Sequence, residues 1–226
     1  MNKKNMSLLI VGLIFLIIFI LMYILIWNSS EPLAIDYAVR DFCYNIRGEK
    51  YGLCYWLFRI ITEFGYLYFA VILGILAIFL FRLDNRFFIY VFIILLATAL
   101  QIAIKDNVSR ARPIESMRWV YESSTSFPSG HSTTSGFILC YFSYIIYESR
   151  LKNKNKGIII AIISFCYLLV LFSRLILGVH YFSDVVAGFS LGIFMGIIGI
   201  YIHLLFNRLE ILNNPLIFKN KENWII

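Results

Sequence analysis

The chain has 226 residues, of which 61% are hydrophobic and only 15% are charged, whereas an ordinary soluble domain carries about a quarter charged residues. Several apolar stretches approach or reach the roughly 20 residues that are needed to cross a bilayer. This composition indicates an integral membrane protein and argues against a secreted or cytosolic enzyme. It also argues against a nucleic-acid binder, because the net charge of +7 is spread over short connectors and forms no basic groove.

The first apolar stretch, residues 8–27, follows Lys3 and Lys4 near the start of the chain. Signal peptides begin in a similar way, but their apolar cores run to only about 7–15 residues and end in a small-residue cleavage site. The stretch seen here is longer, and no such site follows it. We therefore predict a retained first transmembrane helix.

Five more stretches have the apolar character of transmembrane helices. Together with the first they predict an all-α, polytopic membrane bundle with six transmembrane helices, forming a single membrane-embedded domain over residues 1–226. Six spans place both termini on one side of the membrane. The five further stretches cover about 64–81, 87–104, 132–147, 157–175 and 183–206.

The basic residues in the connectors predict the orientation, because cytoplasmic loops collect Lys and Arg. A cytoplasmic N-terminus assigns eleven of the 20 basic residues to the cytoplasm and nine to the outer side. The short connector 148–156 carries four of the eleven, and short connectors have the strongest effect. We expect both termini to be cytoplasmic and the protein to lie in the cytoplasmic membrane.

The connector after the first span has the pattern of an amphipathic helix. Ser30, Glu31 and Pro32 are typical of a helix start. Apolar residues follow at helical spacing, opposite Asp36 and Arg40. We expect a helix lying at the outer membrane surface, with an ordinary connector helix packed on the bundle as the alternative, and neither alternative is expected to affect the chemistry. The apolar residues are Ile35, Ala38, Val39, Phe42 and Ile46.

The four cysteines form no CxxC pair that would indicate zinc or redox chemistry. Cys140 and Cys166 lie inside apolar stretches and are interpreted as small apolar side chains. Cys43 and Cys54 share the first connector, where an oxidising compartment would permit a disulfide. Sequence spacing does not establish the geometry that this disulfide requires.

Ionisable groups next to membrane helices gather in three blocks. A charge near the centre of a membrane helix costs roughly 2.5–3.5 kcal/mol, so such groups require a reason. Block 105–113 ends the third predicted span, block 128–131 precedes the fourth, and block 173–184 joins the fifth to the sixth. The six-span topology places all three on the outer side, where they can form one site.

The side chains of these blocks favour an anion. Lys105, Arg112 and Arg174 are cations, and Ser129 and Gly130 stand at a predicted helix start. Arg presents a planar fork that matches phosphate oxygens, and a helix N-terminus presents unpaired amides and a positive dipole end. We therefore predict a phosphate-binding site.

Two histidines supply reactive groups beside this site. His180 and Asp184 are four residues apart, so on a helical turn the carboxylate can hold one ring nitrogen and leave the other free to attack. His131 is placed to give a proton to a leaving oxygen. The pattern predicts covalent catalysis with His180 as the nucleophile, His131 as the general acid and base, and Asp184 orienting His180.

Simpler interpretations exist for each feature taken singly. Lys105 and Arg112 also fit interfacial anchors, and a Ser-Gly-His sequence at a helix start is often only a cap. His131, His180 and Asp184 also fit a metal site. The three nearby cations oppose a divalent ion, so we expect no metal and no other cofactor.

The three blocks resemble the signature of the type 2 phosphatidic acid phosphatase family, in the same order and with no departure at a motif position. Soluble vanadium-dependent haloperoxidases share these blocks, but six membrane spans argue against that branch. The matching residues are Lys105 with Arg112-Pro113, then Pro128-Ser129-Gly130-His131, then Ser173-Arg174 with His180 and Asp184.

This resemblance implies a metal-independent phosphatase that forms a phosphohistidine on His180. It implies protonation of the leaving group by His131 and orientation of His180 by Asp184. It also implies inhibition by vanadate. The residues that it implies for phosphate binding are Lys105, Arg112, Ser129, Gly130 and Arg174.

The expected substrate is a lipid phosphate or diphosphate that reaches the site laterally from the bilayer, at the outer face of the membrane. Undecaprenyl diphosphate, phosphatidylglycerol phosphate and phosphatidic acid all fit, and the resemblance to bacterial members favours the first two. A lipid phosphotransferase is the first alternative. A transporter or a non-enzymatic anion-binding protein is the second. The sequence gives no indication of the oligomeric state.

Overall fold

A computed structural model describes residues 3–29, 31–81, 84–149 and 151–208, and every regular element in these ranges is helical. The longer helices carry most of the apolar residues and form the bundle. The elements in chain order are α1 (Lys3–Trp27), α2 (Ala34–Ile46), α3 (Leu53–Ile61), the 3-10 helix η1 (Thr62–Gly65), α4 (Leu67–Phe81), α5 (Asp84–Val108), the 3-10 helix η2 (Glu115–Met117), α6 (Gly130–Glu148), α7 (Asn153–Ile176) and α8 (Phe182–Arg208).

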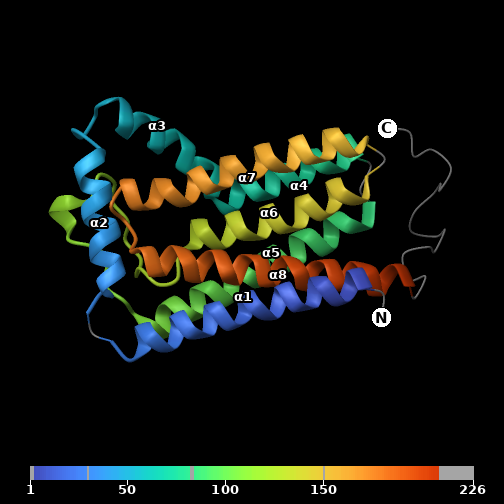
Figure 1. Ribbon diagram of the computed structural model, residues 1–226, viewed down its shortest axis with the longest axis horizontal. Coiled ribbons are helices and arrows are strands. Elements are labelled where there is room, and N and C mark those ends of the chain that lie inside the picture. The colour runs from blue at the N-terminus through green and yellow to red at the C-terminus, as the bar shows by residue number, and fades with distance from the viewer. Residues whose placement is uncertain (1–2, 30, 82–83, 150, 209–226) are drawn as a thin grey trace.

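The long helices run side by side along the long axis, while α2 lies across one end of the bundle (Figure 1). Helix α1 begins, and α8 approaches its end, at the opposite end of the bundle (Figure 1). A hydrogen bond from the Tyr201 hydroxyl to the Asn5 carbonyl joins these two helices there. The start of α1 and the end of α8 therefore lie at the same end of the bundle, as is expected for a chain that crosses the membrane an even number of times.

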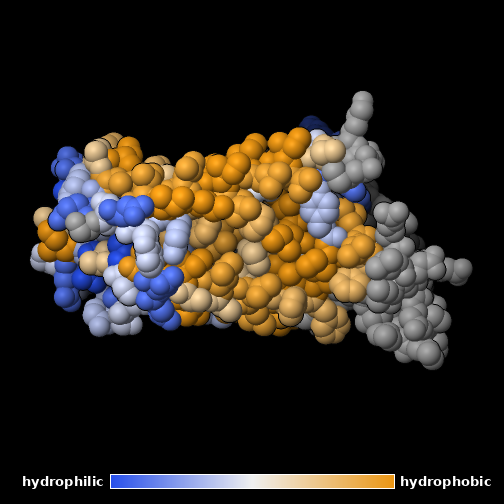
Figure 2. Space-filling view, turned by 90° about the horizontal axis from the view of Figure 1, so that it is seen from below, coloured by the Kyte–Doolittle hydropathy of each residue, from blue (hydrophilic) through white to orange (hydrophobic). Residues whose placement is uncertain are grey.

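The surface along the bundle is apolar, and polar residues gather at the end that carries α2 (Figure 2). Among the described residues, four helices are long and apolar enough to cross a membrane. The bent pair formed by α3–η1 and α4, with an angle of 63°, would make a fifth span. The chain is thus a multi-pass membrane protein. The four spans are Asn5–Trp27, Phe88–Val108, Asn153–Ile176 and Phe182–Phe206.

The predicted count of six spans is not confirmed, because α6 does not meet the same test. Its first turns are rich in Ser, Thr and Gly and are buried within the bundle. Such residues suit contact with other helices better than contact with lipid. Helix α6 therefore lies inside the bundle, in contact with α5, α7 and α8.

Helices α6 and α8 make the most extensive helix–helix contact of the fold. Glycines allow their backbones to touch. A Cβ atom added at Gly192 of α8 would lie 2.1 Å from the Thr133 carbonyl oxygen, and one at Gly188 would lie 2.3 Å from the Ser129 carbonyl oxygen. This close approach requires glycine, and it holds the start of α6 against the start of α8.

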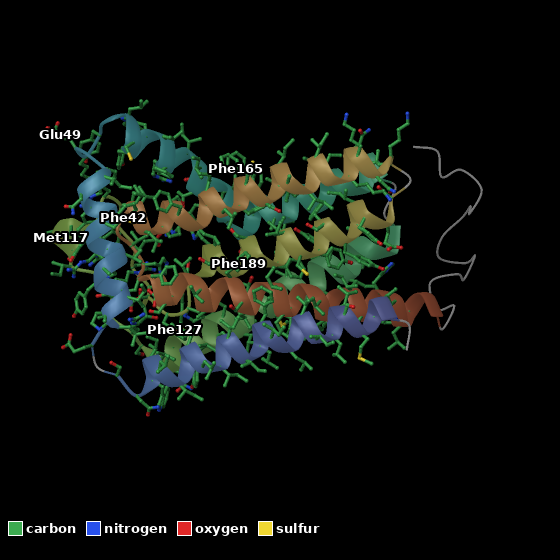
Figure 3. All side chains as sticks on the ribbon, viewed as in Figure 1. Phe42, Glu49, Met117, Phe127, Phe165 and Phe189 are labelled. Atoms are coloured by element: carbon green, nitrogen blue, oxygen red, sulfur yellow. The ribbon has the colours of Figure 1, made fainter. Side chains whose placement is uncertain are left out.

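Helix α2 is present where the first connector predicted a helix, but it begins at Ala34 and not in the predicted Ser30–Pro32 start, where Ser30 lies outside the described residues. On the polar side of this helix Asp36 is fully buried, while on the apolar side Phe42 is 57% exposed. In Figure 3, Phe42 lies on α2, across the end of the bundle. Helix α2 therefore turns a carboxylate toward the bundle.

The cysteines of this connector do not form the disulfide that the sequence permitted, since all four cysteines are free thiols. Cys43 of α2 is buried against Tyr55 and Trp119, and Cys54 packs beside that group. Both therefore serve as apolar packing residues.

Four of the eleven basic residues that the sequence analysis assigned to the cytoplasm lie outside the described residues: Arg82, Arg150, Lys219 and Lys221.

The α6–α8 contact yields a stability prediction. Gly192→Ala would force a methyl group against the Thr133 carbonyl, and we expect a loss of about 1–3 kcal/mol in the free energy of unfolding, as for other overpacked sites. Gly157→Ala is the matched control, because nothing lies within 4 Å of the added methyl group. Thermal unfolding of the purified protein in detergent measures both. Equal midpoints would contradict the close contact, since alanine by itself favours a helix.

Candidate active site

The three predicted blocks meet in a pocket of about 410 Å³ between the outer part of α5, the start of α6 and the end of α7. Six of the eight predicted site residues line it, and Ser129 and Asp184 lie behind this lining. The predicted convergence of the three blocks is thus present in the structure. The six residues in the lining are Lys105, Arg112, Gly130, His131, Arg174 and His180.

His180 is buried between a guanidinium and a carboxylate. Its Nε2 lies 3.2 Å from Arg112 Nη1, and its Nδ1 lies 3.4 Å from Asp184 Oδ2. Because a guanidinium nitrogen only donates hydrogen bonds, we assign the proton of the ring to Nδ1 and a lone pair to Nε2. This tautomer presents an unprotonated nitrogen on the Arg112 side of the ring, as a nucleophile requires.

Asp184 is fully buried, and donors hold both of its oxygens. Oδ2 accepts hydrogen bonds from the Ser126 hydroxyl and from the backbone amide of Tyr181 at 2.8 Å. Oδ1 accepts a hydrogen bond from Arg110 Nη1 at 2.5 Å. The carboxylate therefore has one fixed orientation, with Oδ2 toward the His180 ring.

His131 stands in the first turn of α6, with its Nε2 buried and without a partner among the described residues. The ring of Tyr66 packs against the imidazole at a centroid distance of 4.3 Å. A Cβ atom at Gly65 would lie 2.7 Å from the imidazole, so a glycine is needed where η1 passes His131. Both histidines line the same pocket.

The start of α6 supplies backbone donors. The Ser129 hydroxyl caps the helix by accepting from the Ser132 amide at 3.4 Å, while the Ser129 amide donates to the Asp184 carbonyl at 3.1 Å. Within the described residues, the amides of Gly130 and His131 have no backbone partner, and both residues line the pocket. Ser129 thus shapes the helix start, and the next two amides can bind an anion.

Two cations are held by backbone carbonyls. Lys105 Nζ donates to the carbonyls of Thr125 and Ser126. Arg112 donates through Nε to the Ser124 carbonyl at 2.6 Å and through Nη1 to the Val179 carbonyl at 2.7 Å. These carbonyls are neutral, so they orient both side chains without cancelling their charge.

Arg174 is the third cation and is only 1% exposed. Its Nη1 donates to the Thr62 hydroxyl at 2.6 Å, and its Nη2 lies 2.5 Å from Glu122 Oε1. The Glu122 carboxylate also lies 3.9 Å from Arg112 Nη2. Helix η1 and the loop before α6 thus position the guanidinium at the pocket wall.

Sequence reasoning missed five polar residues that hold this site together. Three of them, Ser126, Glu122 and Thr62, carry no recognisable spacing. Arg110 lies inside the first block, and its charge next to a membrane helix was a signal that the prediction did not use. Asp36 was assigned to the polar side of the connector helix, which was expected to have no bearing on the chemistry. In the structure, Asp36 binds Arg110, which binds Asp184.

A helical membrane bundle with a pocket lined by three cations and two histidines has the features that the sequence analysis predicted for a phosphate site. The PAP2 superfamily model matches residues 86–208, which is more than half of the chain. The chain belongs to the PAP2 superfamily. The resemblance to the type 2 phosphatidic acid phosphatases is thereby confirmed.

Two curated proteins are similar over part of the chain. Phosphatidylglycerophosphatase B of Bacillus subtilis is 37% identical over 93 residues, which is 41% of this chain and 45% of that protein. Dolichyldiphosphatase of Saccharomyces cerevisiae is 34% identical over 121 residues, which is 49% of this chain and 48% of that protein. The matched segments span about half of the length of each relative.

Two solved structures share the fold over most of the chain. The transmembrane PAP2 type phosphatidylglycerolphosphate phosphatase of Bacillus subtilis has a TM-score of 0.70 at 26% identity, covering 90% of this chain and 98% of that one. Aquifex aeolicus LpxE has a TM-score of 0.62 at 26% identity, covering 76% of this chain and 98% of that one. The arrangement of helices around the pocket is thus a membrane PAP2 fold.

The electrostatics of the pocket predict a pH dependence. Burial lowers the pKa of His180 well below its usual value, and the nearby charges of Arg112, Arg174 and Lys105 lower it further. A histidine with a lowered pKa loses its proton at a lower pH, so Nε2 stays reactive below pH 6.5. Arg112→Gln removes one of these charges, and the pKa of His180 should move upward.

The rate at which diethyl pyrocarbonate modifies His180, followed by peptide mass spectrometry across pH, measures this shift without reference to any activity. The expected result is a midpoint at higher pH in Arg112→Gln than in the wild type. Arg40→Gln is the control, because Arg40 pairs with Asp41 on the outside of α2. An unchanged midpoint in Arg112→Gln would contradict the assigned environment.

Proposed function

We propose that this protein is an integral-membrane, metal-independent lipid phosphatase that hydrolyses a lipid phosphate or diphosphate through a phosphohistidine intermediate. The observation that carries the proposal is His180 with Nδ1 at the Asp184 carboxylate and Nε2 beside Arg112, in one pocket with His131. Membership of the PAP2 superfamily supports it, as do the phosphatase names of the relatives.

In the first step, the phosphoryl group of the substrate lies among Lys105, Arg112 and Arg174. His180 Nε2 attacks the phosphorus atom, and the bond from phosphorus to the leaving oxygen breaks. His131 gives that oxygen its proton, so the lipid alcohol or lipid phosphate leaves in a stable form. Asp184 stabilises the positive charge that develops on the His180 ring.

In the second step, water attacks the phosphohistidine and the N–P bond breaks. His131, which is now neutral, takes the proton of the water. The products are inorganic phosphate and a free His180, so the cycle is balanced. The three cations and the amides at the start of α6 stabilise the charge on the phosphoryl oxygens in both steps.

A metal mechanism fits these residues poorly. Both oxygens of Asp184 are occupied by O–H and N–H donors, so this carboxylate is turned away from the pocket. Lys105, Arg112 and Arg174 line the space that a divalent ion would enter. These three cations would repel a divalent cation strongly, because charges interact strongly where water is scarce.

The site is expected at the extracytoplasmic face, between six membrane spans. Helix α6 then counts as a span that is shielded from lipid by its neighbours, and the bent α3–α4 pair supplies another. The connector between α6 and α7, with Lys152, Lys154 and Lys156, lies at the end of the bundle away from α2 (Figure 1). The basic connector then faces the cytoplasm, with both termini on the same side. Helix α2 lies at the outer surface, with Ile35, Phe42 and Ile46 exposed to the bilayer.

Phosphatidylglycerol phosphate is the substrate that we propose first, because a named phosphatase for this lipid covers most of the chain as a structural neighbour. Undecaprenyl diphosphate is the next, since a relative acts, by its name, on a polyprenyl diphosphate. Both present an anionic head on apolar tails, which suits lateral entry. Phosphatidic acid is the third.

The nucleophile is tested with His180→Gln. We expect turnover to be lost and no acid-stable or base-stable phosphoprotein to form, whereas the wild type forms a phosphohistidine that is labile to acid. Rapid quenching in base and mass spectrometry of the labelled peptide measure this. Phosphate release by His180→Gln at the wild-type rate would refute the proposal.

Adding alcohol acceptors to the same assay separates hydrolysis from phosphoryl transfer.

The general acid is tested with His131→Gln and two substrates. A lipid phosphate needs a protonated leaving oxygen, so we expect a loss of about 10²–10⁴-fold in kcat. A nitrophenyl phosphate has a leaving group that is stable without a proton, so formation of the phosphoenzyme should be much less affected. Equal losses on both substrates in single-turnover assays would contradict this role for His131.

The preferred head group is identified by assaying the three proposed lipid substrates, phosphatidylglycerol phosphate, undecaprenyl diphosphate and phosphatidic acid, in mixed micelles.

A further inference from the structure

The buried carboxylate of Asp36 lies outside all three signature blocks. Its side chain accepts four hydrogen bonds, although it belongs to the connector helix α2. The Leu33 amide donates at 3.0 Å, the Ser183 amide and hydroxyl each donate at 2.8 Å, and Arg110 Nη2 donates at 2.8 Å. Asp36 therefore joins the first turn of α2 to the first turn of α8.

Arg110 connects Asp36 to the site. Its guanidinium fork places Nη2 on Asp36 and Nη1 on Asp184 Oδ1, at 2.8 and 2.5 Å, and its side chain is only 9% exposed. Nη1 also donates to the Ser183 hydroxyl at 2.8 Å, and the ring of Tyr181 lies 4.4 Å from the guanidinium carbon. Burial alone would lower the pKa of Arg110, but Asp184 and Asp36 together raise it. The guanidinium is therefore a permanent cation between two buried carboxylates.

This arrangement distinguishes the two oxygens of Asp184. Oδ1 is bound by Arg110, and Oδ2 is left to face the His180 ring. Without the guanidinium, only the donors at Oδ2, the Ser126 hydroxyl and the Tyr181 amide, would hold the Asp184 carboxylate, and its terminal torsion, which is broad and roughly two-fold for an aspartate, would be less restrained.

We propose that Arg110 and Asp36 are positioning residues of the phosphatase reaction, which hold Asp184 so that it orients His180. Arg110 acts directly on Asp184, and Asp36 acts on Arg110. Helix α2 is thereby a structural part of the active site. The inference rests on the proposed function, because it concerns how fast His180 becomes phosphorylated.

The anion-binding residues are held by groups other than Asp36 and Arg110, although Arg112 also contacts the His180 ring. Lys105 and Arg112 are held by the carbonyls of the loop before α6 and of Val179, and Arg174 is held by Thr62 and Glu122. A change at Asp36 should therefore slow the chemical step and leave phosphate binding intact. A general loss of structure would weaken both.

The test compares Asp36→Asn with Asp41→Asn. Both substitutions lie on α2, but Asp41 is exposed, and its ion pair in the described part of the chain is with Arg40. Turnover is expressed per site that binds vanadate, so only folded protein is counted. For Asp36→Asn we expect kcat and the single-turnover rate of phosphoenzyme formation to fall by about 10–100-fold, the range known for outer-shell partners of reactive groups, while KM and the vanadate inhibition constant stay within twofold. Asp41→Asn should match the wild type.

Arg110→Lys is the second variant, which retains the charge but cannot bind both carboxylates as a fork. It should show the same separation of kcat from KM, and the double variant Asp36→Asn/Arg110→Lys should be little slower than the slower single variant. The inference is overturned if kcat per vanadate site matches Asp41→Asn in both variants, or if KM and the vanadate constant rise in step with the loss of kcat. His180→Gln, assayed in parallel, separates the two proposals: activity in that variant refutes the phosphatase mechanism, whereas its inactivity beside an unaffected Asp36→Asn refutes only the role of Asp36.

Discussion

The backbone contact between α6 and α8 is the constraint on which the site depends. Gly188 and Gly192 have no side chains, so the carbonyls of Ser129 and Thr133 can lie against the α8 backbone. This contact brings the second and third blocks together, and the Ser129 amide binds the Asp184 carbonyl across it. His131 and His180 then line one pocket, because α6, which carries His131 in its first turn, begins beside α8, which begins two residues after His180.

The charges of the pocket are tolerated because the polypeptide orients each of them. Lys105 and Arg112 are held largely by backbone carbonyls, which are dipoles and do not neutralise a cation. Donors that are fixed before a ligand arrives stabilise developing charge without the cost of reorganisation. Asp184 differs, because it is held by Arg110, and a second carboxylate on α2 holds that arginine. Beside His180, the carboxylates are therefore paired with the Arg110 guanidinium. On the phosphate side, the three cations outnumber the one carboxylate beside them, Glu122.

Features that depend on residues close together in the sequence could be predicted, whereas most features that depend on contacts between distant residues could not. The three blocks could be recognised because their internal spacings are local: His180 and Asp184 are one helical turn apart, and Ser129 caps the helix that carries His131. Asp36 was missed as a site residue because periodicity describes one helix in isolation and does not show what the polar side of α2 contacts. In the structure, Arg110 attracts the carboxylate inward, and Phe42 faces outward. The six-span count is not confirmed because the first turns of α6 are rich in Ser, Thr and Gly, which makes this helix too polar to meet the criterion for a span that faces lipid.

The amino-acid sequence by itself determined the membrane character, the helical class, the family and the eight candidate site residues, because these depend on composition and on spacings within a few turns. The tertiary structure decided which oxygen of Asp184 faces His180, which nitrogen of His180 lies beside Arg112, and that α2 contacts Asp184 through Asp36 and Arg110. These depend on contacts between residues 74 or 147 positions apart, such as Arg110 with Asp36 and Ser183 with Asp36. No local pattern encodes such pairs, since only the packing of the helices brings them within hydrogen-bonding distance.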